Sequence, residues 1–530
     1  MATRVLLAIA GALILLRVPS LAQPMGPDQG LYAYVGDRIL AGELAYRDAW
    51  DQKPPGIHYV YAALRAISTR DVIVPAADLA AAVLVALCVW IAGTRLGGPA
   101  AGGLAAIFFL LLSDPAMDRY AGVRVRAQAE TFIALAVAGA VALAVGAQGA
   151  KGAKGAGGAG GAQGAVTRGA LAGLLVGAAF TLKYNAGLYA LVVLVAMAFT
   201  RGLRVRDVLV VAAGAAIIPL LTLAVFWRGG AIDDLYQATI TYNLRYSSET
   251  YASRLDMFRY LALFPIRHAR ENPLWFVGGL GCVTLLVTGI RRRPLLIPIV
   301  WAAIACVSIA INGSRELPQY FVQATPALAL AGGVGAVAAL GRGPLALRWT
   351  VAILVAYGCW RVGSEPFPKK LAINAWRDTQ ALTGRVDRRT QLARFGGRET
   401  DKYSALDNAD IGGFLRDKTT ADETVFVFGF SPGSYAYAGR RSASRFFWSR
   451  PVILDFNREN PRYGVAGLRA DLDTARPAYV VLQQHDWSPD VQDSAPFFLS
   501  QPLLSDWLRA GYHEVVPFVD GFSAWERNGR

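Results

Sequence analysis

Long apolar runs separated by short polar loops fill the first 360 residues of the chain. The first run extends from Val5 to Ala22, and only Arg17 and Pro19 interrupt it. Helices need roughly 20 apolar residues to cross a bilayer, so the pattern predicts an α-helical membrane protein with about eleven transmembrane helices. After the first run, the predicted spans are 72–93, 100–112, 127–145, 169–182, 186–199, 208–227, 273–290, 295–311, 319–340 and 344–360.

The apolar stretch 57–67 is too short to span and carries Arg65, which favours a helix lying at the membrane interface. If this stretch does not cross, the basic loops 201–206 (RGLRVR) and 291–293 (RRR) lie on the side of the N-terminus. Basic loops face the cytoplasm, so the first loop and the C-terminal part should lie outside. Residues 21–23 also resemble a signal-peptide cleavage site. We favour a retained first span, because a chain with many later spans needs no separate signal.

Two changes of composition divide the chain. Residues 148–168 are rich in Gly and Ala, which predicts a flexible cytoplasmic linker inside a transmembrane domain of residues 1–362. After residue 362 the sequence has the texture of a soluble protein. Strand-like runs at 424–428 and 478–482, with a helical pattern at 465–474 between them, predict a C-terminal α/β domain of residues 363–530.

Composition and charge agree with a membrane protein. The chain is 54% hydrophobic and only 17% charged, whereas about a quarter of a soluble domain is charged. Its net charge of +15 is spread over short loops between apolar runs, which argues against nucleic-acid binding. The four cysteines lie inside apolar runs, and no two histidines have metal-ligand spacing, so neither a disulfide framework nor a metal cluster is indicated.

The polar loop 23–58 is the densest group of acids, bases and aromatics between the predicted spans. Polar residues kept beside a membrane are functional candidates. Asp28 can serve as a general base if partial burial raises its pKa. Alternatively, Asp28 caps a short helix that starts at Gly30.

The segments PDQGLYAYVGDRILAG (27–42) and YRDAWDQKPPGIHYVYA (46–62) resemble the first outer loop of the GT-C glycosyltransferase superfamily. The similarity is to its protein-mannosyltransferase and aminoarabinose-transferase-like branch. The segment RELPQYFVQATPALAL (315–330) resembles a later motif of these enzymes, and the resemblance covers roughly residues 1–345. It implies a GT-C fold with a large first outer loop carrying interfacial helices.

The resemblance also implies an activity. Members of the branch transfer a sugar from a polyprenyl-phosphate carrier to a glycan, lipid or protein acceptor outside the membrane, which places this chain in the plasma (inner) membrane. The segment 425–447 (VFVFGFSPGSYAYAGRRSASRFF) matches domains often appended to such proteins, without an assigned chemistry. Two alternatives stay open: a transporter or flippase for a glycolipid, and a non-catalytic glycolipid-binding protein. Transporters usually carry ionisable residues at mid-bilayer and repeated halves, and neither pattern is visible here.

Site roles follow from the chemistry of such a transfer. It needs a base for the acceptor, cations for the departing phosphate, and aromatics or amides to hold the sugar. Asp28 is the predicted base of an inverting reaction. The predicted phosphate ligands are Lys53, Arg315, Lys183 and Arg124, and the predicted sugar or acceptor contacts are Tyr32, Tyr320, Gln323 and Asp51.

Each of these roles has a simpler structural alternative. Lys53 could bind a lipid headgroup, and Lys183 could anchor a helix end. Arg315 could pair with Glu316 at the surface.

Two departures from the family pattern bear on cofactors. Gln29 follows Asp28 where relatives carry a second acid, and Gln52 precedes Lys53 where some relatives carry an acidic metal ligand. We therefore expect no metal or other cofactor.

Overall fold

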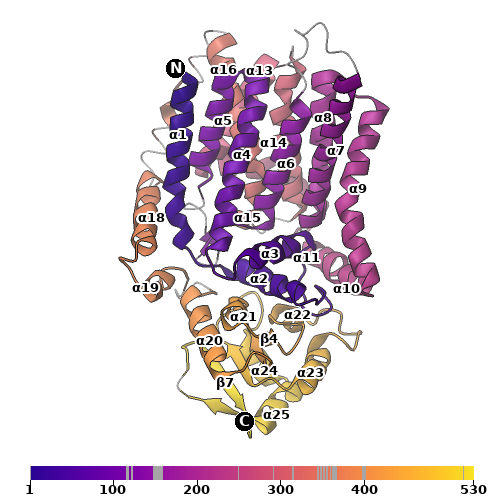
Figure 1. Ribbon diagram of the computed structural model, residues 1–530, viewed down its shortest axis with the longest axis vertical. Helices are drawn as coiled ribbons and strands as arrows, with labels where there is room; N and C mark the ends of the chain where they lie inside the picture. The colour runs from indigo at the N-terminus through magenta and orange to yellow at the C-terminus, as the bar shows by residue number, and fades with distance from the viewer. Residues whose placement is uncertain are drawn as a thin grey trace.

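A computed structural model of the chain describes residues 2–530 except 115–118, 121–122, 147–158, 249, 290–291, 313–315, 343–344, 346–348, 350–351, 354–355, 359, 361–366, 397–401 and 517. Figure 1 shows two parts along its long axis: a bundle of long helices, and a sheet with covering helices beyond one end of the bundle. The N-terminus lies at the end of the bundle that is remote from the sheet.

The bundle is made of apolar helices that lie roughly side by side (Figure 1). Its members are α1 (Ala2–Arg17), α4 (Ile73–Gly97), α5 (Pro99–Leu112), α6 (Ala129–Val145), α7 (Ala159–Leu182), α8 (Tyr189–Arg201), α9 (Val205–Arg228), α13 (Pro273–Gly289), α14 (Ile297–Ile311) and α16 (Thr325–Arg342). Side chains of α9 such as Leu209 and Leu220 are exposed, as expected of a surface that faces lipid. The chain is thus a multi-pass helical membrane protein.

Helix length in the described residues supports the prediction of about eleven spans only in part. Seven helices are long and apolar enough to cross a membrane, or eight if α12 (Arg254–Glu271) and α13, which are bent by 119°, form one span. The predicted spans 100–112 and 127–145 are helices, but they belong to a shorter class of 10–17 residues. The predicted span 344–360 lies largely outside the described residues.

Glycines set the close packing of α7 on α9. A Cβ atom on Gly173 would lie 2.2 Å from the carbonyl oxygen of Val211, and one on Gly214 would lie 2.3 Å from that of Ala170. Small residues let transmembrane helices approach backbone to backbone. Helix α7 begins at Ala159, so the prediction of a flexible linker is wrong for residues 159–168. Alanine favours helix, and a helix already fixed by packing extends at little cost. The rest of that linker lies outside the described residues.

Short helices lie across the end of the bundle that is nearest the sheet (Figure 1). They include α2 (Pro27–Leu40), α3 (Gly56–Ile67), α10 (Ile232–Tyr236) and α11 (Tyr242–Ser248). Helix α15 (Pro318–Phe321) instead begins the span that contains α16. The 12 residues of α3 match the predicted interfacial helix, and α3 packs against α2 rather than crossing the bundle. The polar first loop is therefore a folded layer between the bundle and the sheet.

The C-terminal part contains a five-stranded sheet in the order β4-β3-β5-β7-β6. Strands β4 (Arg441–Ser442), β3 (Thr424–Phe428) and β5 (Tyr479–Gln483) are parallel, and β7 (Phe522–Arg527) and β6 (Tyr512–Val515) are added antiparallel. Its helices are α20 (Ala405–Lys418), α21 (Gly433–Ala438), α22 (Arg450–Ile453), α23 (Gly464–Ala475), α24 (Ser494–Ser500) and α25 (Pro502–Gly511). The strands and helix predicted at 424–428, 478–482 and 465–474 are confirmed within one residue.

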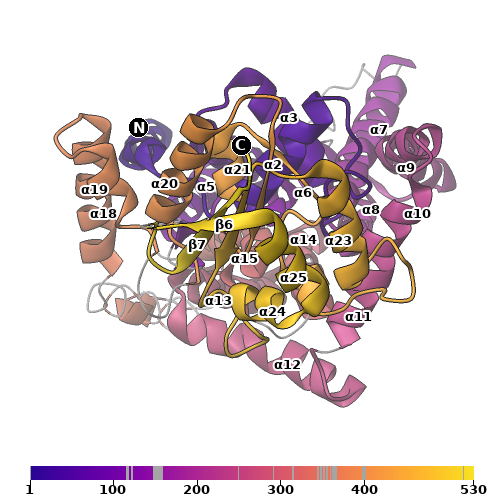
Figure 2. The ribbon, with the colours of Figure 1, turned by 90° about the horizontal axis from the view of Figure 1, so that it is seen from below.

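Helices α18 (Phe367–Leu382) and α19 (Arg388–Leu392) connect the two parts. Helix α18 packs on η1 (Val18–Ala22), next to the first span. Seen from below, the sheet lies over the end of the bundle, with α18 and α19 at one edge (Figure 2). Strands β1 (Arg119–Tyr120) and β2 (Val123–Arg124) form a short antiparallel pair, and two short turns of helix, η3 (Tyr184–Leu188) and η4 (Gln237–Thr241), follow α7 and α10.

Candidate active site

Asp28 lies in the first turn of α2 and does not cap it. The helix begins at Pro27, and proline is favoured at the first helical position because its missing N–H would be unpaired there anyway. The Gly26 N–H donates to the side-chain oxygen of Gln29, and the Gln29 amide donates to the Arg126 carbonyl at 2.6 Å. The alternative that Asp28 caps a helix starting at Gly30 is therefore wrong. The helix starts earlier, at Pro27, and the side chain of Gln29 accepts the hydrogen bond from the N–H of the cap residue Gly26. The carboxylate of Asp28 takes no part in capping the helix.

The loop of residues 48–55, the Lys53 loop, is held by hydrogen bonds to its backbone. The Tyr46 hydroxyl donates to the carbonyl of Lys53 at 2.7 Å, and Asn243 on α11 donates to the carbonyl of Gln52 at 2.6 Å. Tyr46 itself has a φ of 69°, a conformation that costs a bulky residue free energy. The neighbouring structure therefore fixes the position of Lys53.

Gly56 brings the end of this loop against the end of α7. A Cβ atom at position 56 would lie 2.7 Å from the carbonyl oxygen of Thr181, so a larger residue would push the two segments apart. Lys183 follows Thr181 by two residues. Its ammonium forms an ion pair with Glu130 on α6 and lies 4.2 Å from the ring centroid of Tyr320. Two predicted phosphate ligands, Lys53 and Lys183, and one predicted sugar contact, Tyr320, thus share one place.

These three residues line a cavity of about 260 Å³. Its other walls come from the Lys53 loop, the segment after α7, η4, α11 and the end of α14: Gln52, Pro54, Tyr184, Asn185, Thr239, Ile240, Asn243, Leu244, Ile311 and Asn312. Two buried amide atoms of the wall, Oε1 of Gln52 and Nδ2 of Asn312, have no hydrogen-bond partner among the described residues. Buried polar atoms are normally paired, so the cavity offers both a donor and an acceptor to a polar ligand.

Asp28 does not line this cavity, but its carboxylate interacts electrostatically with Lys53 and Lys183, which do. Burial raises the pKa of Asp28 to about 6, while the positive charges of Lys53 and Lys183 oppose the rise. The negative charges of Asp51 and Glu130 add to it. Asp28 makes no hydrogen bond or ion pair with any residue the structure describes. An unpaired carboxylate whose pKa lies nearer neutrality is suited to accept a proton.

Asp51 and His58 form a buried pair that the sequence reasoning missed. Their Oδ2 and Nε2 atoms lie 3.2 Å apart without hydrogen-bond alignment, and neither side chain reaches solvent. Tyr32 and Tyr46 both place their rings edge-on to His58 at a centroid distance of 5.9 Å. The sequence signal was the spacing Asp51–His58 across the Pro-Pro-Gly turn. Asp51 and Tyr32, both predicted sugar contacts, are placed in this packed layer and not in the cavity wall.

Two other predicted ligands have protein partners of their own. Arg124 is buried and pairs with Asp378 of α18 at 3.1 Å. Gln323 is buried too: its oxygen accepts from the Tyr189 and Ser308 hydroxyls at 3.0 and 2.8 Å. A phosphate on Arg124, or a sugar on Gln323, would have to replace these bonds.

The remaining predicted ligand, Arg315, lies outside the described residues. Its suggested partner Glu316 forms an exposed ion pair with Arg267 at 2.9 Å. In the described part of the chain, no three His, Cys, Asp or Glu side chains converge as a metal site would require.

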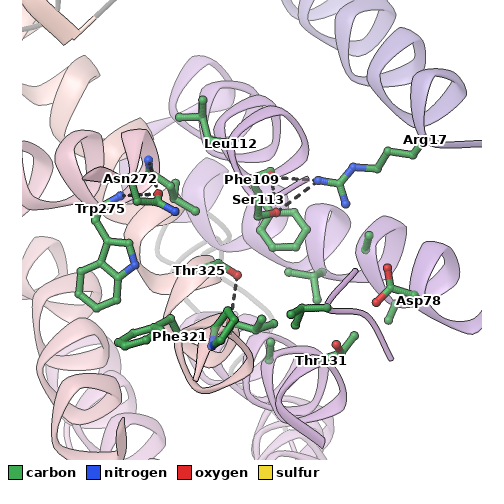
Figure 3. A pocket seen from close by; sticks show the side chains of 18 residues that line it. Arg17, Asp78, Phe109, Leu112, Ser113, Thr131, Asn272, Trp275, Phe321 and Thr325 are labelled. Atoms are coloured by element: carbon green, nitrogen blue, oxygen red, sulfur yellow. Dashed lines mark hydrogen bonds between the residues drawn. The ribbon is translucent and has the colours of Figure 1, made fainter. Parts of the chain in front are cut away.

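A second cavity lies inside the helix bundle (Figure 3). It has a volume of about 70 Å³ and is lined mainly by apolar side chains such as Phe109, Trp275 and Phe321. Arg17 reaches it from α1, but its guanidinium donates to the backbone of α5 and to the Ser113 hydroxyl. This cavity has room for a few waters only, so the Lys53 cavity is the better candidate for a substrate.

The helix bundle, the folded first loop and the sheet at the same end are shared with solved structures. The chain is similar to a crystal structure of ArnT from Cupriavidus metallidurans bound to undecaprenyl phosphate, with 16% identity over 99% of this chain and 98% of the other and a TM-score of 0.57. It is also similar to the oligosaccharyltransferase AglB from Archaeoglobus fulgidus in complex with an inhibitory peptide and a dolichol-phosphate, with 13% identity, coverage of 99% and 74%, and a TM-score of 0.51.

Comparison by sequence alone gives no such similarity. No family model matches the chain, and no curated protein sequence matches it. The resemblance first indicated by the motifs in the polar loop is therefore confirmed at the level of the fold, and the activity is a separate question.

Proposed function

We propose that the protein is a membrane glycosyltransferase that moves a sugar from a polyprenyl-phosphate carrier to an acceptor outside the cytoplasm. The observation that carries the proposal is the cavity with two lysines in its wall, together with the Asp28 carboxylate, which these lysines influence and which no described residue pairs. Both structural neighbours described above were solved with a polyprenyl-type phosphate, undecaprenyl phosphate or dolichol-phosphate. The acceptor is a glycan, lipid or protein hydroxyl or amine.

The proposed reaction is a single displacement. The acceptor oxygen attacks the anomeric carbon while Asp28 takes the proton of that oxygen. The bond between the anomeric carbon and the phosphate oxygen breaks, and its electron pair leaves with the polyprenyl phosphate. Lys53 and Lys183 steady the charge that develops on this phosphate, because a cation in a partly buried site acts more strongly than one in water. We assign contact with the sugar to Gln52, Asn312 and Tyr320, because all three line the cavity.

The test is incubation of the purified protein with a panel of polyprenyl-phosphate hexoses and pentoses, with and without candidate acceptors. We expect release of polyprenyl phosphate with at least one donor, and dependence of that release on the acceptor. A flippase would move the donor across a vesicle membrane and leave the sugar–phosphate bond intact. Translocation without cleavage, or binding without either, would contradict the transferase and support the respective alternative.

The proposed orientation puts the first loop, residues 228–272 and the C-terminal part outside the cytoplasm. The basic loops lie at the other end of the bundle, with the N-terminus, as the positive-inside rule requires. Cysteines introduced at Ser248 and Gly202 test this orientation in intact cells. We expect a membrane-impermeant thiol reagent to label position 248 and not 202, and labelling of both would contradict the orientation.

A further inference from the structure

One segment of the C-terminal part, residues 403–448, contacts both pieces of the first loop that carry site residues. We call it the clamp segment. It includes α20, β3, α21 and β4, and it contains the motif at 425–447 to which no chemistry was assigned. One piece of the first loop is the start of α2 with Asp28, and the other is the Lys53 loop.

The clamp segment holds α2 on both sides of Asp28. The Tyr403 hydroxyl donates to the carbonyl of Met25 at 2.9 Å, and the backbone N–H of Ser442 donates to the Tyr34 hydroxyl at 2.9 Å. Between these bonds the backbones meet: a Cβ atom on Gly30 would lie 2.8 Å from both the Cα and the N of Gly433. Contact through bare backbone leaves α2 no room to approach further.

The same segment holds the Lys53 loop three residues before Lys53. The N–H of Trp50 donates to the carbonyl of Arg445 at 2.9 Å, and the indole N–H of Trp448 donates to the carbonyl of Trp50 at 3.1 Å. Trp50 is fully buried, with the rings of Phe446 and Trp448 around it. Both backbone polar groups of Trp50 therefore depend on the clamp segment.

The contact of Gly433 with α2 lies at the carboxyl end of strand β3. Parallel strands bind ligands beyond their carboxyl ends, where loops are free to surround them. Here the turn after β3 leads to Gly433, and Gly433 meets α2. The place where a soluble domain of this type would hold a ligand is occupied by the helix that carries Asp28.

We propose that the clamp segment is a positioning device that fixes the distance between Asp28 and Lys53. This inference rests on the proposed function, because the distance matters only if the two residues serve one reaction. A base and a phosphate ligand carried by separate segments need a common support, and the clamp segment is bonded to both. Displacements of about 1 Å in reacting geometry can lower a rate by roughly 100-fold.

Gly30→Ala tests the contact directly. Alanine favours helix more than glycine does, so the change is favourable within α2, and any harm must come from the clash with Gly433. Tyr403→Phe and Trp448→Phe each remove one hydrogen-bond donor and keep most of the packing. Gly413→Ala on α20 is the matched control, because a Cβ atom there meets only the end of the Arg416 side chain at 3.9 Å.

Two measurements apply to every variant: donor turnover across pH, and hydrogen exchange of the amides in α2 and in the Lys53 loop. We expect kcat of Gly30→Ala to fall roughly 10- to 100-fold, with the KM of the donor little changed. We also expect the fall of its kcat at low pH to begin at a lower pH than in the wild type. The reason is that burial raises the pKa of Asp28, and the clash with Gly433 would loosen that burial. Exchange in α2 should quicken in Gly30→Ala and Tyr403→Phe, exchange at residues 50–53 in Trp448→Phe, and neither in Gly413→Ala.

Several results would overturn the inference. In one, Gly30→Ala, Tyr403→Phe and Trp448→Phe match Gly413→Ala in both turnover and exchange. In another, they lower only the amount of folded protein, with kcat and its fall at low pH unchanged per folded molecule. A wild-type protein that cleaves no donor would contradict the proposed function instead, and the exchange data would then decide the clamp by themselves.

Discussion

Two polar clusters lie close to the start of α2, and they differ in how their charges are satisfied. The Asp378 cluster joins α18 to the first loop: its carboxylate accepts from Gln23 at 2.7 Å and pairs with Arg124 at 3.1 Å and with Arg394 at 3.8 Å. The Lys53 cluster contains Asp28, Glu130, Lys53 and Lys183. There Glu130 and Lys183 pair, but Asp28 has no hydrogen-bonded partner among the described residues.

The difference separates a structural cluster from a candidate site. Both contain buried acids and bases, so burial and charge alone do not identify function. A buried carboxylate that is fully paired fixes the fold, and removing one of its partners is costly. A partly buried carboxylate without a partner lowers the stability of the fold, and such residues are typical of functional sites. The predictions below test whether the two clusters really differ in this way.

The largest effect is expected for Asp28→Asn. The change keeps the shape of the side chain and removes the base, so transfer should fall by roughly 10²- to 10⁴-fold while donor binding persists. Asp28 must be ionised to accept a proton, and its pKa is about 6. Wild-type kcat should therefore be high above pH 6 and fall as the pH drops below 6. The residual kcat of Asp28→Asn should not show this fall.

Asp37→Asn is the matched control for this prediction. Asp37 lies on the same helix but holds Arg65 through both carboxylate oxygens at 2.8 Å, so its loss should lower stability rather than kcat. Near-normal turnover of Asp28→Asn would instead point to Asp37 or Glu130 as the base.

A smaller effect is expected for Lys53→Met, which keeps the aliphatic stem and removes the charge. Loss of a charged hydrogen bond, worth about 1.5–3 kcal/mol, should weaken binding of polyprenyl phosphate roughly 10- to 100-fold. Lys370→Met, at an exposed lysine of α18, should leave binding unchanged. Equal affinities of Lys53→Met and the wild type in a binding titration would refute the phosphate role of Lys53.

The Asp378 cluster should respond in the opposite way. Arg124→Met removes one partner of a buried pair, so we expect a loss of about 3 kcal/mol in the free energy of unfolding, at the low end because Gln23 and Arg394 remain. Donor affinity and kcat per folded molecule should stay at the wild-type level. A steep loss of donor affinity at unchanged stability would return Arg124 to the phosphate site where the sequence placed it.

No effect is expected from chelation. Gln29 and Gln52 stand where carboxylates would be needed for a hard divalent cation, so turnover should survive EDTA. Loss of turnover that one divalent ion restores would contradict this and would make Asp48 and Asp51 the first candidate ligands.

Much of the fold was predictable because the thickness of the bilayer sets the length of an apolar run, and the positive-inside rule sets the side of the basic loops. The helix at 57–67 and the strand at 424–428 are local patterns, and both elements are confirmed. The helical start of α7 was missed because Gly/Ala composition does not reveal a helix that tertiary packing extends. The count of about eleven spans stays a prediction, because α5 and α6 are shorter than the other apolar helices and residues 344–360 are only partly described.

The site was predictable only in part. A family motif and isolated polar residues mark Asp28, Lys53, Lys183 and Tyr320 in the sequence, and the structure brings the last three to one cavity. Arg124 and Gln323 look the same in sequence, and only the folded chain gives them their partners Asp378 and Ser308. The pairing of Glu130 with Lys183, and the unpaired amides of Gln52 and Asn312, depend on segments far apart in the chain.

The central claim is that Asp28 acts as the base of a direct displacement. A double displacement would need a carboxylate nucleophile besides the base, and the nearby acids Asp51 and Glu130 are engaged with His58 and Lys183. The most direct measurement is the anomeric configuration of the product formed from a donor of known configuration. Single displacement predicts inversion at the anomeric carbon, and a product that retains the donor configuration would contradict the account.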